Sequence, residues 1–343
     1  MTHYANATTQ KENGTVLGGK LIREGGLVAF PTETVYGLGA NGLDGEAVRR
    51  IFEAKGRPGD NPLILHVAKK SDVKKLWSRV PESARVLMDT FWPGPLTLVY
   101  QKSSLVPDEV TAGLPTVAVR MPDNKTALAL IREAGVPIAA PSANLSGKPS
   151  PTTAQHVRED MENKVDLIID GGPCRFGLES TVLSLVGEPT ILRPGAVTKE
   201  MLEAAWGGVK LAPSILSPMK EGEVAASPGM KYRHYAPQCE VLVARGDARA
   251  AAGKICREYD RRAGLGQNAV IFATAQTQPF YRDRRCVIIG DRNEPATICA
   301  QLFARLREYS DKVDVVLAEA LPEGDMGLAY MNRLLRAAGF NTI

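Results

Sequence analysis

The sequence is poor in cysteine and in long apolar runs. Its 343 residues include five scattered cysteines, with no CxxC spacing and no Cys/His cluster. This pattern argues against a zinc site and against a disulfide framework, and it is typical of a reducing cytoplasm. No apolar stretch approaches the length that spans a membrane. We therefore expect a cytoplasmic protein without a membrane segment.

The N-terminal residues also lack an apolar segment of the kind found in secretory signals. They are mostly polar, and we expect residues 1–14 to form a disordered leader. An excess of one charge is missing too: residues 1–208 contain 23 basic and 23 acidic residues, so the net charge of +4 arises in the remainder. Because a dedicated nucleic-acid-binding domain usually has a strong basic bias, this balance argues against RNA binding as the main role of the first 208 residues.

Two common catalytic signatures are absent, and a third is present only in outline. The sequence has neither a Walker A motif nor a GxSxG nucleophile elbow. Gly37, Gly39 and Gly42 spell GxGxxG before a helical pattern. The preceding PTETVY, however, is polar and broken by proline, unlike the first strand of a dinucleotide-binding unit. We expect a Gly-rich turn that permits a close backbone approach, and not a dinucleotide site.

The hydrophobic pattern divides the chain into two α/β regions. Residues 15–206 alternate between helical and strand patterns without a strict rhythm, which predicts an α/β domain on a twisted mixed sheet. Residues 207–238 are rich in Pro, Ser, Gly, Lys and Glu and have no periodicity, so we expect a long linker. Residues 239–343 alternate regularly, which predicts a small, mostly parallel, three-layer Rossmann-like domain.

The predicted linker contains the sequence SPGMKYRHYAP at residues 227–237. Two tyrosines, a histidine and two cations are unusual in a flexible connector, which is normally small and polar. A lid that folds over a ligand explains these residues as well as a strap that packs between domains does.

Four cations occur where α/β folds place ligand-binding groups. Lys55 and Arg57 lie in a loop stiffened by two prolines, and a lysine beside an arginine can grip a polyphosphate. The alternative is that the helix dipole favours both cations at a helix C-terminus, which explains the charges but not the stiffening. Arg120 and Arg193 each end a strand pattern, so the four residues together predict a cationic pocket.

Several uncharged polar residues accompany these cations. His66 closes an apolar strand pattern, where a lone histidine is more often a core residue than a ligand contact. The polar residue Thr34, at the end of an earlier strand, adds weight to a substrate-facing role for His66. Ser142 and Ser180 lie in polar turns without an evident His–Asp partner, so we predict that they bind substrate and do not act as nucleophiles.

Several strings taken together resemble one enzyme family. PTETVYGL, KGRPGDNPLILHV, PSANLSGKPSPT, ESTV and LRPGA are similar to the YrdC-like domain of the L-threonylcarbamoyladenylate synthases. SPGMKYRHYAP and the C-terminal GLAYMNRLLRAAG are similar to the long, two-domain form of these enzymes. The resemblance covers nearly all of the chain from about residue 15, and it includes several independent motifs.

The resemblance implies that L-threonine, bicarbonate and ATP give threonylcarbamoyl-AMP and pyrophosphate, with Mg²⁺ held mainly by phosphates. It implies a threonine pocket and a nucleotide side, with Lys55 and Arg57 also acting in catalysis and with no metal held by protein side chains. The residues implied for threonine are Thr34, His66, Arg120, Ser142 and Ser180. Those implied for ATP are Lys55, Arg57, Asn61, Thr116, Ala140 (through its backbone), Asn144, Ser150, Arg193 and Tyr232.

The resemblance also implies a partner: a separate tRNA threonylcarbamoyl transferase complex would use the product to modify the tRNA adenosine beside the anticodon. Direct contact with tRNA stays open. Two other functions are compatible with a cationic α/β pocket, namely an RNA-binding module and a carbamoyl transferase that uses carbamoyl phosphate.

Overall fold

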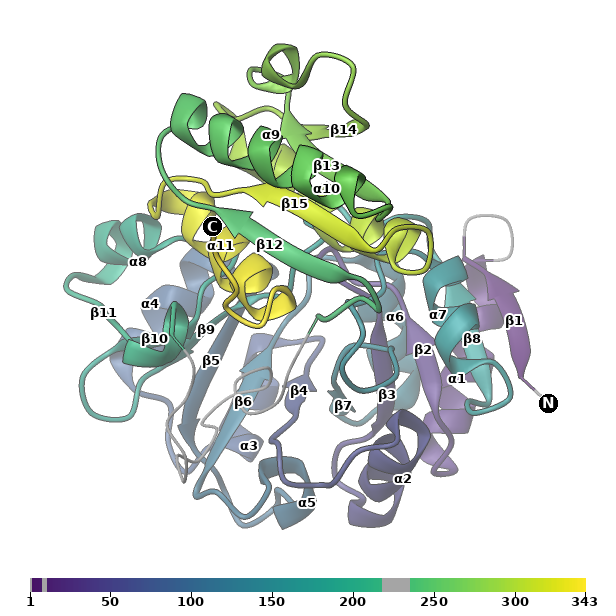
Figure 1. Cartoon of the computed structure of the whole chain (residues 1–343). Coiled ribbons are helices and arrows are strands. Elements are labelled where there is room, and N and C mark those ends of the chain that lie inside the picture. The colour runs from purple at the N-terminus through teal and green to yellow at the C-terminus, as the bar shows by residue number, and fades with distance from the viewer. Residues whose placement is uncertain (1, 8–10, 218–234) are drawn as a thin grey trace. The chain divides into compact units, whose positions relative to one another are not determined.

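The computed structural model describes residues 2–7, 11–217 and 235–343 (Figure 1). These residues form two compact units, each with its own sheet and its own apolar core. The first unit contains residues 2–146 and 150–215, and the second contains residues 147–149, 216–217 and 235–343. Within the described residues, no helix is long and apolar enough to cross a membrane.

The first unit is organised around a sheet of eleven strands in the order β1-β8-β2-β3-β7-β4-β6-β5-β9-β10-β11. The strands are β1 His3–Asn6, β2 Val28–Phe30, β3 Gly37–Asn41, β4 Ile64–His66, β5 Leu96–Gln101, β6 Thr116–Arg120, β7 Ile138–Ala140, β8 Leu167–Asp170, β9 Thr181–Ser184, β10 Thr190–Arg193 and β11 Lys210–Leu211. Both kinds of pairing occur: the neighbours from β2 to β4 are antiparallel, and from β4 to β11 parallel and antiparallel pairs alternate. The predicted mixed sheet is confirmed.

Helices connect these strands and cover part of the sheet. They are α1 Lys11–Arg23, α2 Gly45–Lys55, η1 Lys70–Asp72, α3 Val73–Leu76, α4 Glu82–Phe91, α5 Asp108–Thr111, α6 Lys125–Ala134, α7 Ala154–Met161, α8 Lys199–Trp206 and η2 Pro213–Ile215. Apolar residues of α1 and α6 pack with those of β2, β7 and β8 in one buried cluster. This cluster is an apolar core of the first unit.

Local signals fix the ends of α2, which carries Lys55. Asp44 is the N-cap, and its side chain accepts hydrogen bonds from the backbone N–H groups of Glu46 and Ala47. Gly56 ends the helix in the left-handed conformation, with φ of 64°. The helical pattern expected after the GxGxxG sequence is therefore confirmed, and Lys55 is its last residue.

Two of the three glycines of the GxGxxG sequence occupy a strand and the third, Gly42, lies in the turn after it, so the expected Gly-rich turn is wrong for Gly37 and Gly39. Gly37 and Gly39 belong to β3, which pairs antiparallel with β2. A Cβ atom on Gly39 would lie 2.9 Å from the ring of Phe30, and one on Gly37 would lie 3.1 Å from it. The glycines therefore provide the space in which the Phe30 ring lies across β3.

The prediction of a disordered leader over residues 1–14 is wrong for most of that segment. Residues 3–6 form β1, which pairs in parallel with β8, and α1 begins at Lys11. At the other end of the unit, β11 pairs with β10, so the start of the predicted linker belongs to the sheet. Residues 218–234, which include most of the SPGMKYRHYAP sequence and Tyr232, lie outside the described residues.

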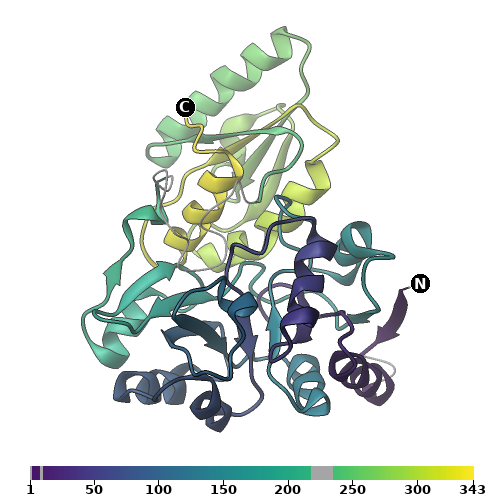
Figure 2. The same ribbon diagram turned by 90° about the horizontal axis from the view of Figure 1, so that it is seen from below.

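The second unit has a four-stranded, entirely parallel sheet in the order β12-β15-β13-β14. Its elements are β12 Glu240–Ala244, α9 Ala248–Gly264, β13 Ala269–Thr274, η3 Gln278–Tyr281, β14 Cys286–Gly290, α10 Pro295–Tyr309, β15 Val315–Glu319 and α11 Asp325–Ala337. Helix α9 packs on one face, and α10 and α11 pack against each other on the opposite face (Figures 1 and 2). The predicted three-layer parallel domain is confirmed.

Candidate functional site

The sheet register gathers candidate residues on one face of the first unit. His66 is paired with Arg120, and Arg120 is paired in turn with Thr97. Because directly opposed residues project from the same face of a sheet, these three side chains form a polar row across β4, β6 and β5. On the same face of the sheet, the next row of paired residues is apolar and consists of Ile64, Ala118 and Val99.

Arg120 connects the segment before β3 to this row. Its Nη1 atom donates to the hydroxyl of Thr34 at 2.9 Å, and its Nε atom donates to the carbonyl of Gly94 at 3.2 Å. Its Nη2 atom lies 2.7 Å from a carboxylate oxygen of Glu33, in an ion pair whose side chains are 4% and 3% exposed. The structure thus brings together Thr34, His66 and Arg120, and it adds Glu33.

The ion pair between Arg120 and Glu33 leaves hydrogen-bonding capacity unused. Its geometry makes no hydrogen bond, so Arg120 Nη2 and both carboxylate oxygens of Glu33 are buried without a hydrogen-bond partner among the described residues. Burying two charges costs several kcal/mol per ion unless hydrogen bonds offset the lost hydration. In most proteins buried polar atoms are satisfied, so these atoms require an explanation.

His66 is an uncharged group at neutral pH. Burial is the main cause that lowers the pKa of its imidazole to about 3, and the neighbouring Arg120 charge adds to the effect. The ring lies edge-on to Phe30, with 6.1 Å between ring centroids, and Nδ1 is 3.1 Å from the carbonyl oxygen of Ile64. A neutral imidazole beside a guanidinium can orient a polar ligand without adding a second positive charge.

Ser180 and Arg193 extend the polar row to β9. The hydroxyls of Ser180 and Thr97 are 2.8 Å apart. Arg193 donates through Nη2 to the Ser180 hydroxyl at 3.2 Å and through Nε to the Ser180 carbonyl at 3.1 Å. Contacts and register therefore link two of the predicted threonine residues, Arg120 and Ser180, through Thr97.

A second group of candidates surrounds the end of α2. The ammonium of Lys55 donates to the carbonyls of Ser142 at 2.5 Å and Asn144 at 2.6 Å. Lys55 is only 2% exposed, so it is not a solvated cation at a helix end. The Ser142 hydroxyl also donates to the amide oxygen of Asn144 at 2.5 Å. Lys55 thus fixes the segment after β7 in which Ser142 and Asn144 lie.

Arg57 and Asn61 lie in the loop between α2 and β4. The guanidinium of Arg57 is 5.4 Å from the ring centroid of Phe52, and its Nη2 donates to the carbonyl of Asn61 at 3.4 Å. Asn61 is fully buried, yet neither its amide nitrogen nor its amide oxygen has a hydrogen-bond partner within the described part of the chain. Asn61 therefore has the same unused hydrogen-bonding capacity as Arg120.

The remaining candidates are less closely connected. Thr116 begins β6 on the same face as Arg120, and Ala140 pairs with Ile64. Ser150 donates to a carboxylate oxygen of the buried Glu179. Tyr232 lies outside the described residues. Among the residues that are described, no group of three His, Cys, Asp or Glu side chains could hold a metal ion.

Sequence reasoning missed Glu33 and Thr97. Glu33 lies inside the PTETVY string, next to the predicted residue Thr34, and its charge was the available signal. Thr97 carried no comparable signal, because it is an uncharged residue in the mostly apolar strand LTLVYQ. Its place beside Arg120 depends on the pairing of β5 with β6.

Two family models match the chain. Residues 20–195 match Sua5_yciO_yrdC, described as telomere recombination. Residues 197–339 match Sua5_C, described as the C-terminal domain of threonylcarbamoyl-AMP synthase. The two matches together cover most of both units.

Relatives of known name match over most of their length. The chain is 47% identical over 326 residues to threonylcarbamoyl-AMP synthase of Bacillus subtilis, which covers 94% of this chain and 92% of that relative. It is 39% identical over 344 residues to the protein of the same name from Schizosaccharomyces pombe, covering 91% and 84%. The crystal structure of P. abyssi Sua5 complexed with L-threonine matches with a TM-score of 0.93 at 46% identity, covering 100% of this chain and 99% of that one.

Proposed function

The chain belongs to the threonylcarbamoyl-AMP synthase family, and from this premise we propose that it converts L-threonine, bicarbonate and ATP into threonylcarbamoyl-AMP, pyrophosphate and water. The threonine amine and bicarbonate form a carbamate with loss of water. A carbamate oxygen then bonds to the α-phosphorus of ATP, and the bond from that phosphorus to the pyrophosphate oxygen breaks. The enzyme is thus of the nucleotidyl-transfer type.

The observation that carries the proposal is the unused hydrogen-bonding capacity at Arg120 and Asn61. Both are buried, and both retain polar atoms without a hydrogen-bond partner among the described residues. Such atoms become satisfied when a polar ligand binds. The threonine carboxylate and the carbamate are anionic, so they complement the positive charge of Arg120. An amide such as Asn61 can both donate hydrogen bonds to a nucleotide and accept them from it.

We assign the threonine pocket to the polar row and its neighbours. Arg120 offers to the carboxylate its Nη2 donor, which makes an ion pair but no hydrogen bond with Glu33, and neutral His66 beside it provides a further polar contact. Thr34 and Ser180 supply hydroxyls next to the guanidinium groups of Arg120 and Arg193. Ser142, held near Lys55 by the carbonyl contact, completes the proposed threonine set.

Part of the proposed nucleotide set, namely Lys55, Arg57, Asn61 and Asn144, lies around the end of α2. In this proposal Arg57 and Lys55 offset the charge that develops as the carbamate attacks the α-phosphorus. Lys55 acts partly by position, because it fixes the segment of Asn144 through backbone carbonyls. Asn61, Thr116, Ser150, Arg193 and the backbone of Ala140 line the nucleotide side, and Tyr232 joins this set as a prediction from the resemblance alone.

No covalent intermediate with the protein is needed. The reacting groups are the carbamate and ATP, so catalysis consists of holding them together, excluding water and offsetting charge. Mg²⁺ enters with ATP as part of the substrate, and phosphates and water are its ligands in this proposal. The product then passes to a separate tRNA threonylcarbamoyl transferase complex in the cytoplasm.

The decisive experiment measures pyrophosphate release by the full chain with threonine, bicarbonate, ATP and Mg²⁺. We expect release that requires all four components and yields a threonylcarbamoyl adenylate by mass spectrometry. Absence of release, or release that is independent of threonine, would overturn the proposal. The matched variant is Arg57→Ala, for which we expect at least a tenfold loss with little change in stability, and the control is the distant surface variant Lys164→Ala.

The two alternative functions give different results in the same assay. A carbamoyl transferase would consume carbamoyl phosphate and need no bicarbonate, so the exchange of one for the other separates the reactions. An RNA-binding module would bind RNA tightly, with an affinity that falls steeply with salt, in the absence of threonine and ATP. The balanced charge of residues 1–208 argues against the second alternative.

A further inference from the structure

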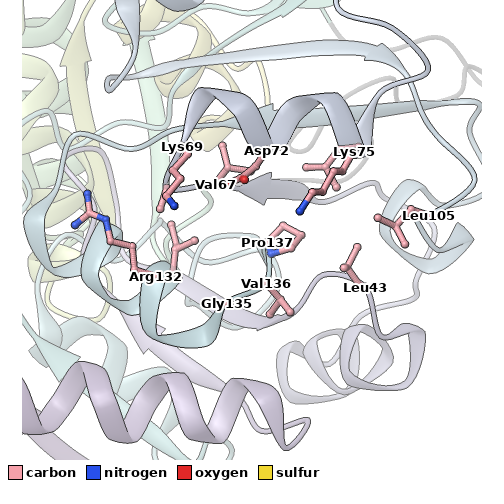
Figure 3. Close-up of a pocket in the computed structure, with 13 residues that line it drawn as sticks. Leu43, Val67, Lys69, Asp72, Lys75, Leu105, Arg132, Gly135, Val136 and Pro137 are labelled. Atoms are coloured by element: carbon pink, nitrogen blue, oxygen red, sulfur yellow. The ribbon is translucent and has the colours of Figure 1, made fainter.

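A groove in the first unit lies apart from the residues assigned above. It has a volume of about 380 Å³ and is lined by the segment that follows β4, by η1 and α3, and by the C-terminal end of α6 with the residues after it (Figure 3). None of the proposed threonine or nucleotide residues that the structure describes lines it. The lining residues are Leu43, Val67, Ala68, Lys69, Asp72, Lys75, Leu76, Leu105, Ile131, Arg132, Gly135, Val136 and Pro137.

Apolar side chains make up most of the groove. Val67, Leu76 and Ile131 are at most 4% exposed and pack into the core below it. Leu105, in contrast, is 48% exposed and stands at one end (Figure 3). Sites for small ligands are typically concave, of roughly 300–1,000 Å³, and mostly apolar with a few polar groups. The groove fits this description at the small end of the range.

Three cations border these apolar walls. Lys69 and Lys75 extend from the segment of η1 and α3 toward the side where Val136 and Pro137 lie, and Arg132 stands at one end of the groove (Figure 3). Within the described part of the chain, none of the three forms a salt bridge or a side-chain hydrogen bond. Asp72 is the one carboxylate among the lining residues, so the groove carries a net positive charge.

Two other cations of the same unit are paired with carboxylates. Lys70, next to Lys69 in the chain, pairs with Asp89 at 2.8 Å, and Arg175 pairs with Asp123 at 3.0 Å. Fixing a lysine or arginine side chain costs conformational entropy, which a charged partner must offset. The three cations at the groove have no carboxylate partner among the described residues, so they can pair with an anionic ligand. The ligand that matches both features has an apolar body and an anionic group.

We propose that this groove is a binding site for a small amphipathic anion, with an aromatic or aliphatic body of one or two rings in size and a phosphate, sulfonate or carboxylate group. The body lies against Val67, Leu76 and Ile131. The anionic group pairs with Lys69, Lys75 or Arg132. A protein helix, whose diameter with side chains is about 10–12 Å, would not fit in a groove of this volume. The proposal does not depend on the proposed function of the chain.

The experiment uses 8-anilinonaphthalene-1-sulfonate, an amphipathic anion that fluoresces in apolar surroundings, with the full chain. We expect one saturable site. The double variant Lys75→Ala/Arg132→Ala should weaken binding at least tenfold. The control Lys74→Ala/Lys164→Ala removes the same charge from two exposed lysines outside the groove, one of them beside Lys75. It should leave the affinity unchanged.

A second pair of variants tests the apolar part. Val136→Trp fills the groove and should weaken the probe at least tenfold, whereas Val186→Trp, at a position 40% exposed elsewhere, should not. Displacement by 1-naphthyl phosphate should be much stronger than displacement by inorganic phosphate. Far-UV circular dichroism establishes that each variant is folded.

Three results would overturn the proposal. They are the absence of saturable binding to the unaltered chain, equal binding by the groove and control variants, and equal displacement by inorganic phosphate and by 1-naphthyl phosphate. Pyrophosphate release should be the same in the groove variants as in the unaltered chain. Failure of the groove proposal is therefore distinguishable from failure of the proposed reaction.

Discussion

Buried polar groups occur in both units, but their surroundings differ. In the first unit Asn61 and Glu33 are at most 4% exposed, and their side-chain oxygens lack hydrogen-bond donors among the described residues. In the second unit Glu319 is equally buried, at 1%, and its carboxylate accepts from Tyr281 at 2.6 Å and pairs with Arg292 at 3.2 Å. The Thr277 hydroxyl donates to the same carboxylate.

The difference separates two uses of buried polarity. An unsatisfied buried polar atom costs about 1–3 kcal/mol, so it persists where a ligand satisfies it. A fully hydrogen-bonded cluster stabilises the fold and needs no ligand. One atom in the second unit, Nε of Arg305, also lacks a partner, but that side chain is 33% exposed and pairs with Glu308. We therefore infer that the substrates bind and react in the first unit.

The largest expected effect is at Arg120. Arg120→Ala should lower kcat/KM for threonine at least about 100-fold and reduce the free energy of unfolding by about 3–5 kcal/mol, because Glu33 is left as an uncompensated buried charge. Pyrophosphate release and chemical denaturation measure the two effects. Adding Glu33→Gln should restore stability but not activity. The proposed role would be wrong if the double variant regained both.

The sharpest test of the comparison exchanges a polar side chain for an apolar one in each unit. Asn61→Leu removes unsatisfied atoms, so it should leave stability unchanged or slightly increased while activity falls about tenfold or more. Thr277→Val removes a donor to Glu319, so it should cost about 1–3 kcal/mol of stability without changing the rate per folded molecule. If both variants lost stability alike, the distinction between the two units would fail.

A pH titration tests the burial of His66. The folded pKa is about 3 and the unfolded value is 6.5, so the unfolded chain binds the extra proton first as pH falls. The resulting loss of stability begins near pH 6.5, and at pH 5 it should reach about 2 kcal/mol relative to pH 7. His66→Gln should flatten this part of the curve. A curve of unchanged slope in the variant would show that other groups cause the acid sensitivity.

The smallest effect is expected at Tyr281. Tyr281→Phe removes one of several donors to Glu319, and should reduce the free energy of unfolding by about 1 kcal/mol. Thermal or urea denaturation measures the change. Pyrophosphate release should not alter, and a marked loss of activity would mean that the polar cluster of the second unit takes part in the reaction.

The sequence predicted the elements whose signals are local. The helical pattern after the GxGxxG sequence was recognisable, and the structure shows that α2 has its own N-cap at Asp44 and its own stop at Gly56. The alternation of the second unit predicted a parallel sheet for a similar reason. In contrast, β3 was missed because its sequence GLGAN has two glycines and no β-branched residue. Its strand form depends on the neighbouring β2 and β7.

The same distinction between local and tertiary signals applies to the residues of the candidate site. His66 and Arg120 were recognisable by residue type and by their places at strand ends. Their placement side by side required the pairing of β4 with β6, which no local pattern contains. Glu33 and Thr97 are identified as site residues only by their tertiary contacts with Arg120, an ion pair for Glu33 and a strand pairing for Thr97. Lys55 was predicted as a cation at a phosphate, whereas the structure also gives it a tie to two backbone carbonyls.

The pairing of β1 with β8 has a consequence for synthesis in the cell. The hydrogen bond from Thr2 to the carbonyl of Val165 spans 163 residues. At about 5–20 residues per second, the ribosome makes the β8 side of this contact roughly 10–30 s after the β1 side. The segment 2–7 must wait unpaired during that interval, while β2 and β3 can already form their hairpin. Closure of this sheet edge is therefore expected to be a late event in the folding of the first unit.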